Sequence, residues 1–213
     1  MSGLINVMLV DDHAVVRMGF RMLLETAADI KVIAEAENGE QAVKLYMEHQ
    51  PDVVVMDITM PGIGGLEAIE RIMAKDNSAR ILVLSAHEDS VHPKRVLSAG
   101  AMGYLTKRSA AEELIKAIRT VASRKRYLEA SVAQQMAIQQ LSGETNPVDI
   151  LSDREFEVFI ALAKGKTTNE IADTLCLSPR TVGTHLYNIK QKLNASNSAE
   201  IALIAMRSGL IDP

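Results

Sequence analysis

The chain has 213 residues, of which 47% are hydrophobic and 23% charged, a composition typical of a globular protein with one large or two small domains. Its single cysteine excludes an internal disulfide and suits a reducing compartment. The net charge is only −4 and no apolar run reaches the roughly 18–20 residues of a membrane span, so composition points to a cytoplasmic protein without membrane contact.

Residues 1–122 alternate between short apolar runs and amphipathic helical patterns. We expect strands at 5–10, 31–36, 53–56, 80–85 and 103–106, separated by helices near 14–27, 39–49, 65–75, 91–99 and 110–122. Strands that alternate with helices of about 10–15 residues indicate βαβ units and a parallel sheet. Residues 1–122 are therefore predicted to form an α/β doubly wound domain with a five-stranded parallel sheet.

Residues 123–148 differ in composition and form the predicted linker. A short basic step at 124–126 precedes a pattern for a lone helix at 131–141, with Val132, Met136 and Ile138 as its apolar positions. The sequence Ser-Gly-Glu-Thr-Asn-Pro that follows has the chemistry of a loop. We place the domain boundaries near 122 and 149.

From 149 to 213 the pattern is purely helical, with strong start signals. The capping-box spacing, in which each side chain binds the other residue's backbone N–H, occurs at Ser152–Glu155 and at Thr167–Glu170. Ser178 is a candidate N-cap with proline at the first helical position. Four short helices with a tight connection at 176–179 predict a small all-α helix-turn-helix domain, whose cysteine we expect in the core.

Polar side chains follow the predicted strands of the first domain where each strand ends. They are Asp11 and Asp12 after the first strand, Asp57 after the third, Ser85 at the end of the fourth and Lys107 after the fifth. Each alone is more often a turn former or a solvated side chain. Because functional groups gather at the carboxyl ends of parallel strands, the whole set predicts one acidic site.

Such a site suits phosphoryl transfer onto a carboxylate. Mg²⁺, or Mn²⁺ in its place, prefers oxygen ligands, which Asp12, Asp57 and the backbone carbonyl of Thr59 supply, while Asp11 holds a metal-bound water. The cation neutralises the phosphoryl group, and Asp57 is the candidate nucleophile. Lys107 pairs with Asp57 before reaction and with a phosphoryl oxygen afterwards.

At these residues the first domain resembles the receiver domain of two-component response regulators. The motifs are Asp11-Asp12, the run from Asp57 to Gly62, Ser85-Ala86 and the run from Tyr104 to Lys107. The resemblance implies a flavodoxin-like or CheY-like fold and phosphorylation of Asp57 by a sensor histidine kinase. It also implies that Ser85 and Tyr104 move as switch residues with Lys107. Many receivers have a cis proline after this lysine; here Arg108 follows.

The third helix of the second domain has one apolar and one polar face. Val182, Leu186, Ile189 and Leu193 form a stripe that must face the core. The remaining positions are polar and free of acids, as in a recognition helix that enters the major groove. Most amphipathic helices do not bind DNA, so this face alone leaves the question open. The DNA-binding candidates are Arg180, Thr181, Thr184, Tyr187, Asn188 and Lys190 on this helix, with Thr167, Thr168 and Lys192 as phosphate contacts.

Residues 149–213 resemble the LuxR-type helix-turn-helix domain. The motifs are the runs 151–155, 170–172 and 177–182 with Gly165, His185, Asn188-Ile189, Lys192-Leu193 and 209–211. A receiver joined to this domain defines NarL/FixJ-type response regulators. Within that type the chain is most similar to GacA-like and UvrY-like regulators, on motifs at 11–13, 60–68, 126–127, 133–135 and 175–179. This implies a hybrid sensor kinase as partner. His185-Leu186 departs from the Tyr-Arg pair expected there, and Gly183 offers no side chain to a base.

The leading hypothesis is a transcription factor that phosphorylation activates. Its partners would be the kinase, promoter DNA, RNA polymerase and, once phosphorylated, a second copy in a homodimer. It would not be an enzyme beyond accepting a phosphoryl group and losing it by autodephosphorylation. One alternative is a phosphohydrolase, but its general acid commonly lies two residues after the nucleophile, where this chain has Thr59. Another is a receiver that no longer accepts phosphate, which the intact acidic set disfavours.

Overall fold

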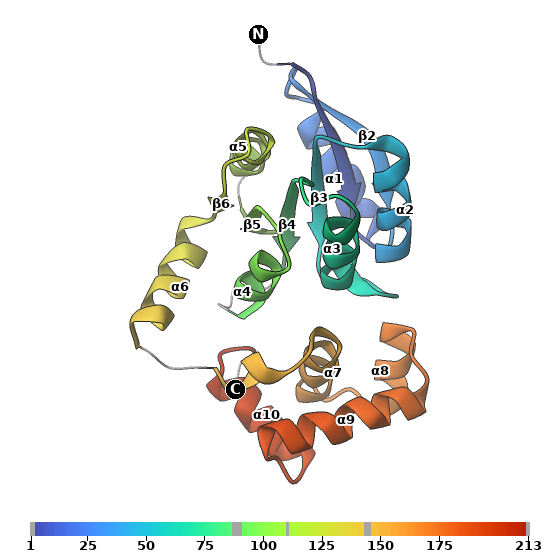
Figure 1. Ribbon diagram of the computed structural model, residues 1–213, viewed down its shortest axis with the longest axis vertical. Coiled ribbons are helices and arrows are strands. Elements are labelled where there is room, and N and C mark those ends of the chain that lie inside the picture. The colour runs from blue at the N-terminus through green and yellow to red at the C-terminus, as the bar shows by residue number, and fades with distance from the viewer. Residues whose placement is uncertain (1–2, 87–90, 110, 143–145, 212–213) are drawn as a thin grey trace. The chain divides into compact units, whose positions relative to one another are not determined.

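The structure, a computed structural model, describes residues 3–86, 91–109, 111–142 and 146–211. These residues form two compact units, 1–136 and 137–213 (Figure 1). Within the described ranges, no helix combines the length and the hydropathy that crossing a membrane requires.

The first unit is built around a parallel sheet whose six strands have the order β2-β1-β3-β4-β5-β6. The strands are β1 (Ile5–Val10), β2 (Ile30–Ala36), β3 (Val53–Asp57), β4 (Ile81–Ser85), β5 (Gly103–Thr106) and β6 (Tyr127–Leu128). The helices between them are α1 (Ala14–Leu24), α2 (Gly39–His49), α3 (Gly64–Lys75), α4 (Val91–Ser98) and α5 (Ala111–Ala122). The predicted α/β doubly wound fold is confirmed.

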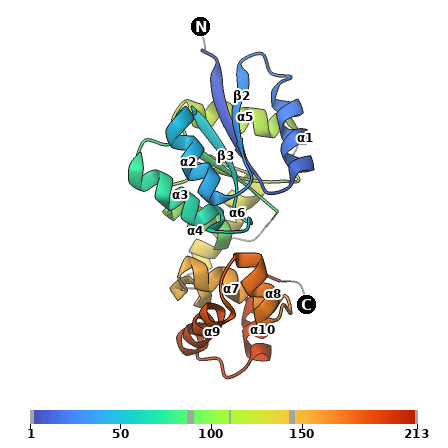
Figure 2. The ribbon, with the colours of Figure 1, turned by 90° about the vertical axis from the view of Figure 1, so that its right-hand side faces the viewer.

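Two cores cover the two faces of this sheet because successive strand residues point to opposite sides. Val54 and Met56 of β3 pack with α2 and α3, whereas Val53 and Val55 pack with α1 and α5. Figure 2 shows α2 and α3 on one side of the strands and α1 on the other. With both faces buried, the strands read as continuous apolar runs, which is why the sequence pattern located them.

The strand count differs from the sequence prediction. The five predicted strands are present, but Tyr127 and Leu128 of the predicted linker add β6, which pairs in parallel with β5. Two residues are too few for any hydrophobic period, so this strand left no signal in the sequence. Helix α1 ends at Leu24 rather than at 27, and position 110, where we began the fifth helix, lies outside the described residues.

The linker continues from β6 into α6 (Ala130–Ser142), one residue longer at each end than predicted. Val132 is 1% exposed and, with the partly buried Met136, packs into the core on the α2, α3 and α4 face of the sheet. Ile138, the third predicted apolar position, is instead 59% exposed. The first turns of α6 are therefore part of the first unit. Of the predicted loop after it, 143–145 lie outside the described residues.

The second unit contains a short 3-10 helix, η1 (Pro147–Ile150), and the four predicted helices, α7 (Asp153–Ala163), α8 (Thr168–Leu175), α9 (Pro179–Leu193) and α10 (Ser198–Arg207). Both capping boxes and the Ser178 cap are present, which confirms those predictions. The expectation for Cys176 is wrong: this residue is exposed, because it occupies the left-handed cap of α8, with φ 52°, where the chain turns away from the core.

Candidate functional site

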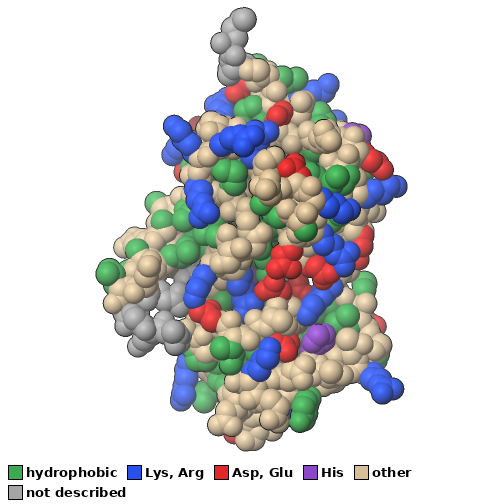
Figure 3. All heavy atoms as spheres, viewed as in Figure 1, with side chains coloured by type: hydrophobic (Ala, Val, Ile, Leu, Met, Phe, Trp, Pro, Cys, Tyr) green, Lys and Arg blue, Asp and Glu red, His purple; other side chains and the backbone are tan. Residues whose placement is uncertain are grey.

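The carboxyl ends of neighbouring strands collect the predicted site residues of the first unit. Asp11 follows β1, Asp57 ends β3, Ser85 ends β4 and Lys107 follows β5. These four strands are adjacent in the sheet. Parallel strands end at the same edge, so their polar side chains meet there. In the first unit, Figure 3 shows acidic side chains gathered toward one end.

Lys107 joins the two buried carboxylates of this edge. Its Nζ donates hydrogen bonds of 2.7 Å to Asp11 Oδ2 and of 2.7 Å to Asp57 Oδ2. Asp11 is 4% exposed and Asp57 is 3% exposed, so both carboxylates are largely withdrawn from water. Burial of an unpaired charge is costly, and the shared ammonium group offsets that cost for both acids.

The protonation of the pair follows from burial and charge. Burial raises the pKa of the Asp57 carboxyl, since loss of hydration outweighs the attraction of Lys107 and the Thr59 N–H. Burial also opposes the charge on Lys107, but Asp57 and Asp11 outweigh that effect and raise the pKa of Lys107. The lysine is therefore an ammonium ion at neutral pH, and the charge state of Asp57 depends on the cations beside it.

The acid pair after β1 has the donor set of a divalent-cation site. Ligand atoms of Asp11, Asp12 and His13 lie within 4.8 Å of one another. Asp12 Oδ1 is buried and accepts no hydrogen bond among the described residues, although His13 Nδ1 is 2.8 Å away. A carboxylate oxygen removed from water in this way is unfavourable, and a hard cation would satisfy it. The residues present therefore fit a cation that takes oxygen ligands.

Close backbone packing shapes the loop after β3. The Thr59 N–H donates to Asp57 Oδ1 at 3.2 Å, which folds the chain back over its own carboxylate. A Cβ on Gly65 would lie 2.1 Å from the carbonyl oxygen of Asp57, so only glycine allows this approach. Thr59, whose carbonyl we predicted as a metal ligand, is exposed beside that carboxylate.

Of the three predicted switch residues, Ser85 and Tyr104 are each 0% exposed, and Lys107 contacts the two carboxylates described above. The carbonyl oxygen of Ser85 accepts a 2.7 Å hydrogen bond from the backbone N–H of Lys107. Tyr104 belongs to the core cluster that also contains Val132 of α6. No peptide bond among the described residues is cis, so the bond between Lys107 and Arg108, where many receivers have proline, is trans.

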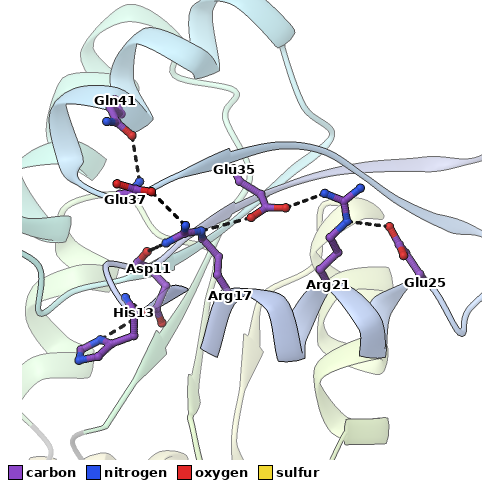
Figure 4. Close-up of polar contacts among 8 residues, drawn as sticks. All are labelled: Asp11, His13, Arg17, Arg21, Glu25, Glu35, Glu37 and Gln41. Atoms are coloured by element: carbon purple, nitrogen blue, oxygen red, sulfur yellow. Dashed lines mark hydrogen bonds and ion pairs between the residues drawn. The ribbon is translucent and has the colours of Figure 1, made fainter. Parts of the chain in front are cut away.

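Sequence reasoning missed Arg17, a buried arginine that holds the turn between β1 and α1. Its Nη1 donates a 2.7 Å hydrogen bond to the backbone carbonyl of Asp11, and its other nitrogens bind Glu35 and Glu37 at 3.2 Å (Figure 4). Arg21, one turn later, binds Glu35 at 2.7 Å. The end of β2 is thus tied to the acidic pair through the arginine.

A signal for Arg17 was present in the sequence. It lies seven residues before the buried Leu24, on the inward side of α1, and is only 8% exposed. A charged residue on the apolar side of an amphipathic helix needs a buried partner, which the sequence could not identify.

In the second unit, α9 presents the predicted DNA face. Val182 and Ile189 of its apolar stripe are 0% exposed, and Leu186 and Leu193 are partly buried. Tyr187 is 64% exposed, and such exposure of a large aromatic side chain suits a residue that contacts a partner. Around it lie the other predicted contacts of this helix, exposed or partly exposed: Arg180, Thr181, Thr184, Asn188 and Lys190.

Two of the predicted phosphate contacts have partners inside the domain. The Thr167 N–H donates to the Glu170 carboxylate at 2.8 Å within the capping box of α8, where Thr168 is the first residue. Lys192 Nζ lies 2.6 Å from Glu155 Oε2. A DNA phosphate at either group would have to compete with a carboxylate of the protein itself.

Family comparisons agree with both units. Residues 7–119 match the response regulator receiver domain, and residues 149–205 match the luxR family of bacterial regulatory proteins. The chain belongs to the response regulators in which a receiver domain precedes a luxR-type DNA-binding domain.

The relatives extend over nearly the whole chain. Response regulator UvrY of Escherichia coli K12 is 44% identical over 209 residues, 97% of this chain and 96% of that protein. Response regulator GacA of Pseudomonas aeruginosa PAO1 is 39% identical over 211 residues, 98% of this chain and 99% of that protein. RcsB of Salmonella enterica serovar Typhimurium, solved with promoter rprA and the phosphomimetic BeF₃⁻, is 25% identical with a TM-score of 0.69, covering 95% of this chain and 98% of that one.

The predicted class of function is confirmed. The protein is a two-component response regulator, in which phosphorylation signalling through the receiver controls DNA-binding transcription regulation by the luxR-type domain. This membership favours a regulator over the phosphohydrolase considered from the sequence.

Proposed function

We propose that Asp57 is the residue that accepts the phosphoryl group. The observation that carries this proposal is the 2.7 Å contact of Lys107 with a carboxylate that is 3% exposed. The ammonium group holds the carboxylate of Asp57 in place. It also supplies positive charge where negative charge would develop on the phosphoryl oxygens. Ser85, at the end of the neighbouring strand, is the candidate donor to a phosphoryl oxygen, and the movement of Ser85 and Tyr104 is the proposed switch.

We further propose that Mg²⁺, or Mn²⁺ in its place, binds at this edge of the sheet. Asp12, Asp57 and the Thr59 carbonyl would be direct ligands, and Asp11 would act through a bound water. When bound, the cation supplies positive charge that neutralises the phosphoryl oxygens. The buried Asp12 Oδ1, which accepts no hydrogen bond among the described residues although His13 Nδ1 lies 2.8 Å away, supports this assignment.

The DNA face of α9 is proposed to read promoter sites as part of a homodimer that phosphorylation favours, since two helix-turn-helix units read paired half-sites. Its contacts would be Arg180, Thr181, Thr184, Tyr187, Asn188 and Lys190, with phosphate held by Thr167, Thr168 and Lys192. A sensor histidine kinase, hybrid in type as the resemblance to GacA-like and UvrY-like regulators implies, would donate the phosphoryl group. RNA polymerase would be the final partner.

The division into a receiver at 1–122, a linker at 123–148 and a DNA-binding domain at 149–213 is part of this proposal. The two family matches, which end at 119 and begin at 149, support it. Because its DNA target lies in the bacterial cytoplasm, we place the protein there. Autodephosphorylation of Asp57 is the one chemical activity that we assign to it.

Mass spectrometry of the intact protein tests the phosphoryl acceptor. Incubation with phosphoramidate and MgCl₂ should add one phosphoryl group to the wild type and none to Asp57→Asn. Asp52→Asn is the matched control, because Asp52 precedes the same strand at its other end. A phosphoryl group that remains on Asp57→Asn would reject the assignment of Asp57.

Fluorescence-anisotropy titrations with promoter DNA test the DNA face. Tyr187→Ala should weaken binding to specific DNA by about tenfold or more, as loss of a base contact does. Arg207→Ala, an exposed residue at the end of α10, is the control and should change little. Equal effects of the two variants would show that α9 does not read the DNA.

A further inference from the structure

The carboxylate of Glu129, in the linker, contacts the end of β5. Glu129 Oε2 accepts a 2.9 Å hydrogen bond from the Thr106 N–H and a 2.7 Å hydrogen bond from Ser109 Oγ. These bonds outweigh the burial of the carboxyl group and hold the pKa of Glu129 below its usual range. Glu129 is therefore an anion at neutral pH, bound to two residues that flank a functional loop.

That loop carries Lys107. The Ser109 N–H donates to the Thr106 carbonyl at 3.1 Å and the two hydroxyl groups lie 3.2 Å apart, so 106–109 form a tight turn with Glu129 as its shared acceptor. Lys107 stands inside this turn and extends to Asp57. A shift of this turn would move the ammonium group of Lys107 away from the carboxylate of Asp57.

Glu129 also starts the linker helix. Its carbonyl oxygen accepts from the Ala133 N–H, the first hydrogen bond of α6, and its own N–H donates to the Tyr104 carbonyl at 3.2 Å. Val132, three residues later, packs in the core cluster that contains Tyr104. Glu129 thus contacts β5, which carries Tyr104, as well as the Lys107 turn and the helix that leads to the DNA-binding domain.

We propose that Glu129 is a positioning residue for Lys107, and that through it the occupied phosphoryl site and the start of α6 stabilise each other. If the Lys107 turn increases the affinity for the phosphoryl group, the bound phosphoryl group stabilises the docking of α6 by the same free energy, since coupling between two sites is reciprocal. This inference rests on the proposed role of the acidic site.

The test uses the full-length protein with Mg²⁺ and beryllofluoride as the phosphoryl mimic, followed by ¹⁹F NMR. Glu129→Ala should raise the dissociation constant of beryllofluoride about fivefold, a typical size for such coupling. Glu129→Gln keeps one acceptor oxygen for the Thr106 N–H and should recover part of the affinity. Beryllofluoride should also slow hydrogen exchange of the α6 amides in the wild type, and not in Glu129→Ala.

Glu113→Ala is the matched control. Glu113 accepts a hydrogen bond from the Tyr127 hydroxyl, so its loss loosens β6 without touching the Lys107 turn. It should leave beryllofluoride affinity unchanged. Affinity of Glu129→Ala within twofold of wild type, or an equal loss in Glu113→Ala, would overturn the inference while leaving the proposed function intact. A wild type that binds no beryllofluoride would overturn both. Thermal unfolding of each variant confirms that it is folded.

Discussion

Lys107 donates a 2.7 Å hydrogen bond to Asp57 across a separation of 50 residues in the chain. This contact unites two strand ends that lie far apart in the sequence. It also makes the receiver's stability depend on one ammonium group, because Asp57 and the nearby Asp11 are both buried carboxylates that share it.

Replacing Lys107 by methionine should destabilise the receiver. In metal-free buffer at pH 7 we expect the free energy of unfolding to fall by about 3 kcal/mol, the usual cost of removing one partner of a buried ion pair. Urea titration followed by receiver NMR resonances measures it. Lys116→Met, whose side chain is 66% exposed, is the control and should have little effect. Equal losses would show that the buried position of Lys107 is not the cause.

The same variant should respond to pH in a defined direction. Burial raises the folded-state pKa of Asp57, so the stability that this group contributes is present at low pH and is lost as pH rises through that pKa. Without Lys107 the pKa rises further. The difference in the free energy of unfolding between wild type and Lys107→Met should therefore grow from pH 5 to pH 8. A difference that shrinks over this range would contradict the argument.

Arg17→Met should also destabilise the receiver, by about 2–3 kcal/mol, because it leaves the buried carbonyl of Asp11 without its donor and removes one of the two arginines that bind Glu35. Arg21→Met, which loses only exposed ion pairs, should cost much less. Urea unfolding at pH 7 compares the two variants. If both cost the same, the hydrogen bond to the Asp11 carbonyl contributes nothing.

Two glycines of the DNA-binding domain should respond to alanine in opposite directions. Gly183 lies inside α9, and among the described residues nothing beyond the helix's own backbone lies within 4 Å of the position that a Cβ would take. Gly183→Ala should therefore stabilise the domain by about 0.5–1 kcal/mol. Gly165 has equal space but φ +82°, so Gly165→Ala should destabilise by about 1 kcal/mol. Differential scanning calorimetry measures both. Loss of stability in Gly183→Ala would contradict the prediction.

Glu155 should make the DNA-binding domain sensitive to acid. Burial opposes its charge, but Lys192 and the Ser152 N–H outweigh burial and lower the pKa of Glu155. Its contribution is therefore present above pH 4.5 and is lost as pH falls through the folded-state pKa. Glu155→Gln should cost about 1–2 kcal/mol at pH 7 and less at pH 3. Circular dichroism during thermal unfolding at both pH values provides the measurement.

Much of the fold was predictable because its signals are local. Continuous apolar runs located β1 and β3, and the spacing of Ser152 and Glu155 located the start of α7. The two-residue strand β6 and the exposure of Cys176 were not predictable, because each depends on what the rest of the chain places beside it.

The sequence by itself determined the strand ends that carry carboxylates and the helix that carries the polar face, since these follow from residue type and periodicity. Its resemblance to known families, rather than these patterns, indicated the class of protein. Only the tertiary structure decided the polar contacts that the sequence did not indicate. Lys107 meets Asp11 across 96 residues, Arg17 binds the carbonyl of Asp11, and Lys192 pairs with Glu155. Burial and electrostatic pairing act through space, at distances of a few ångströms that no local pattern specifies.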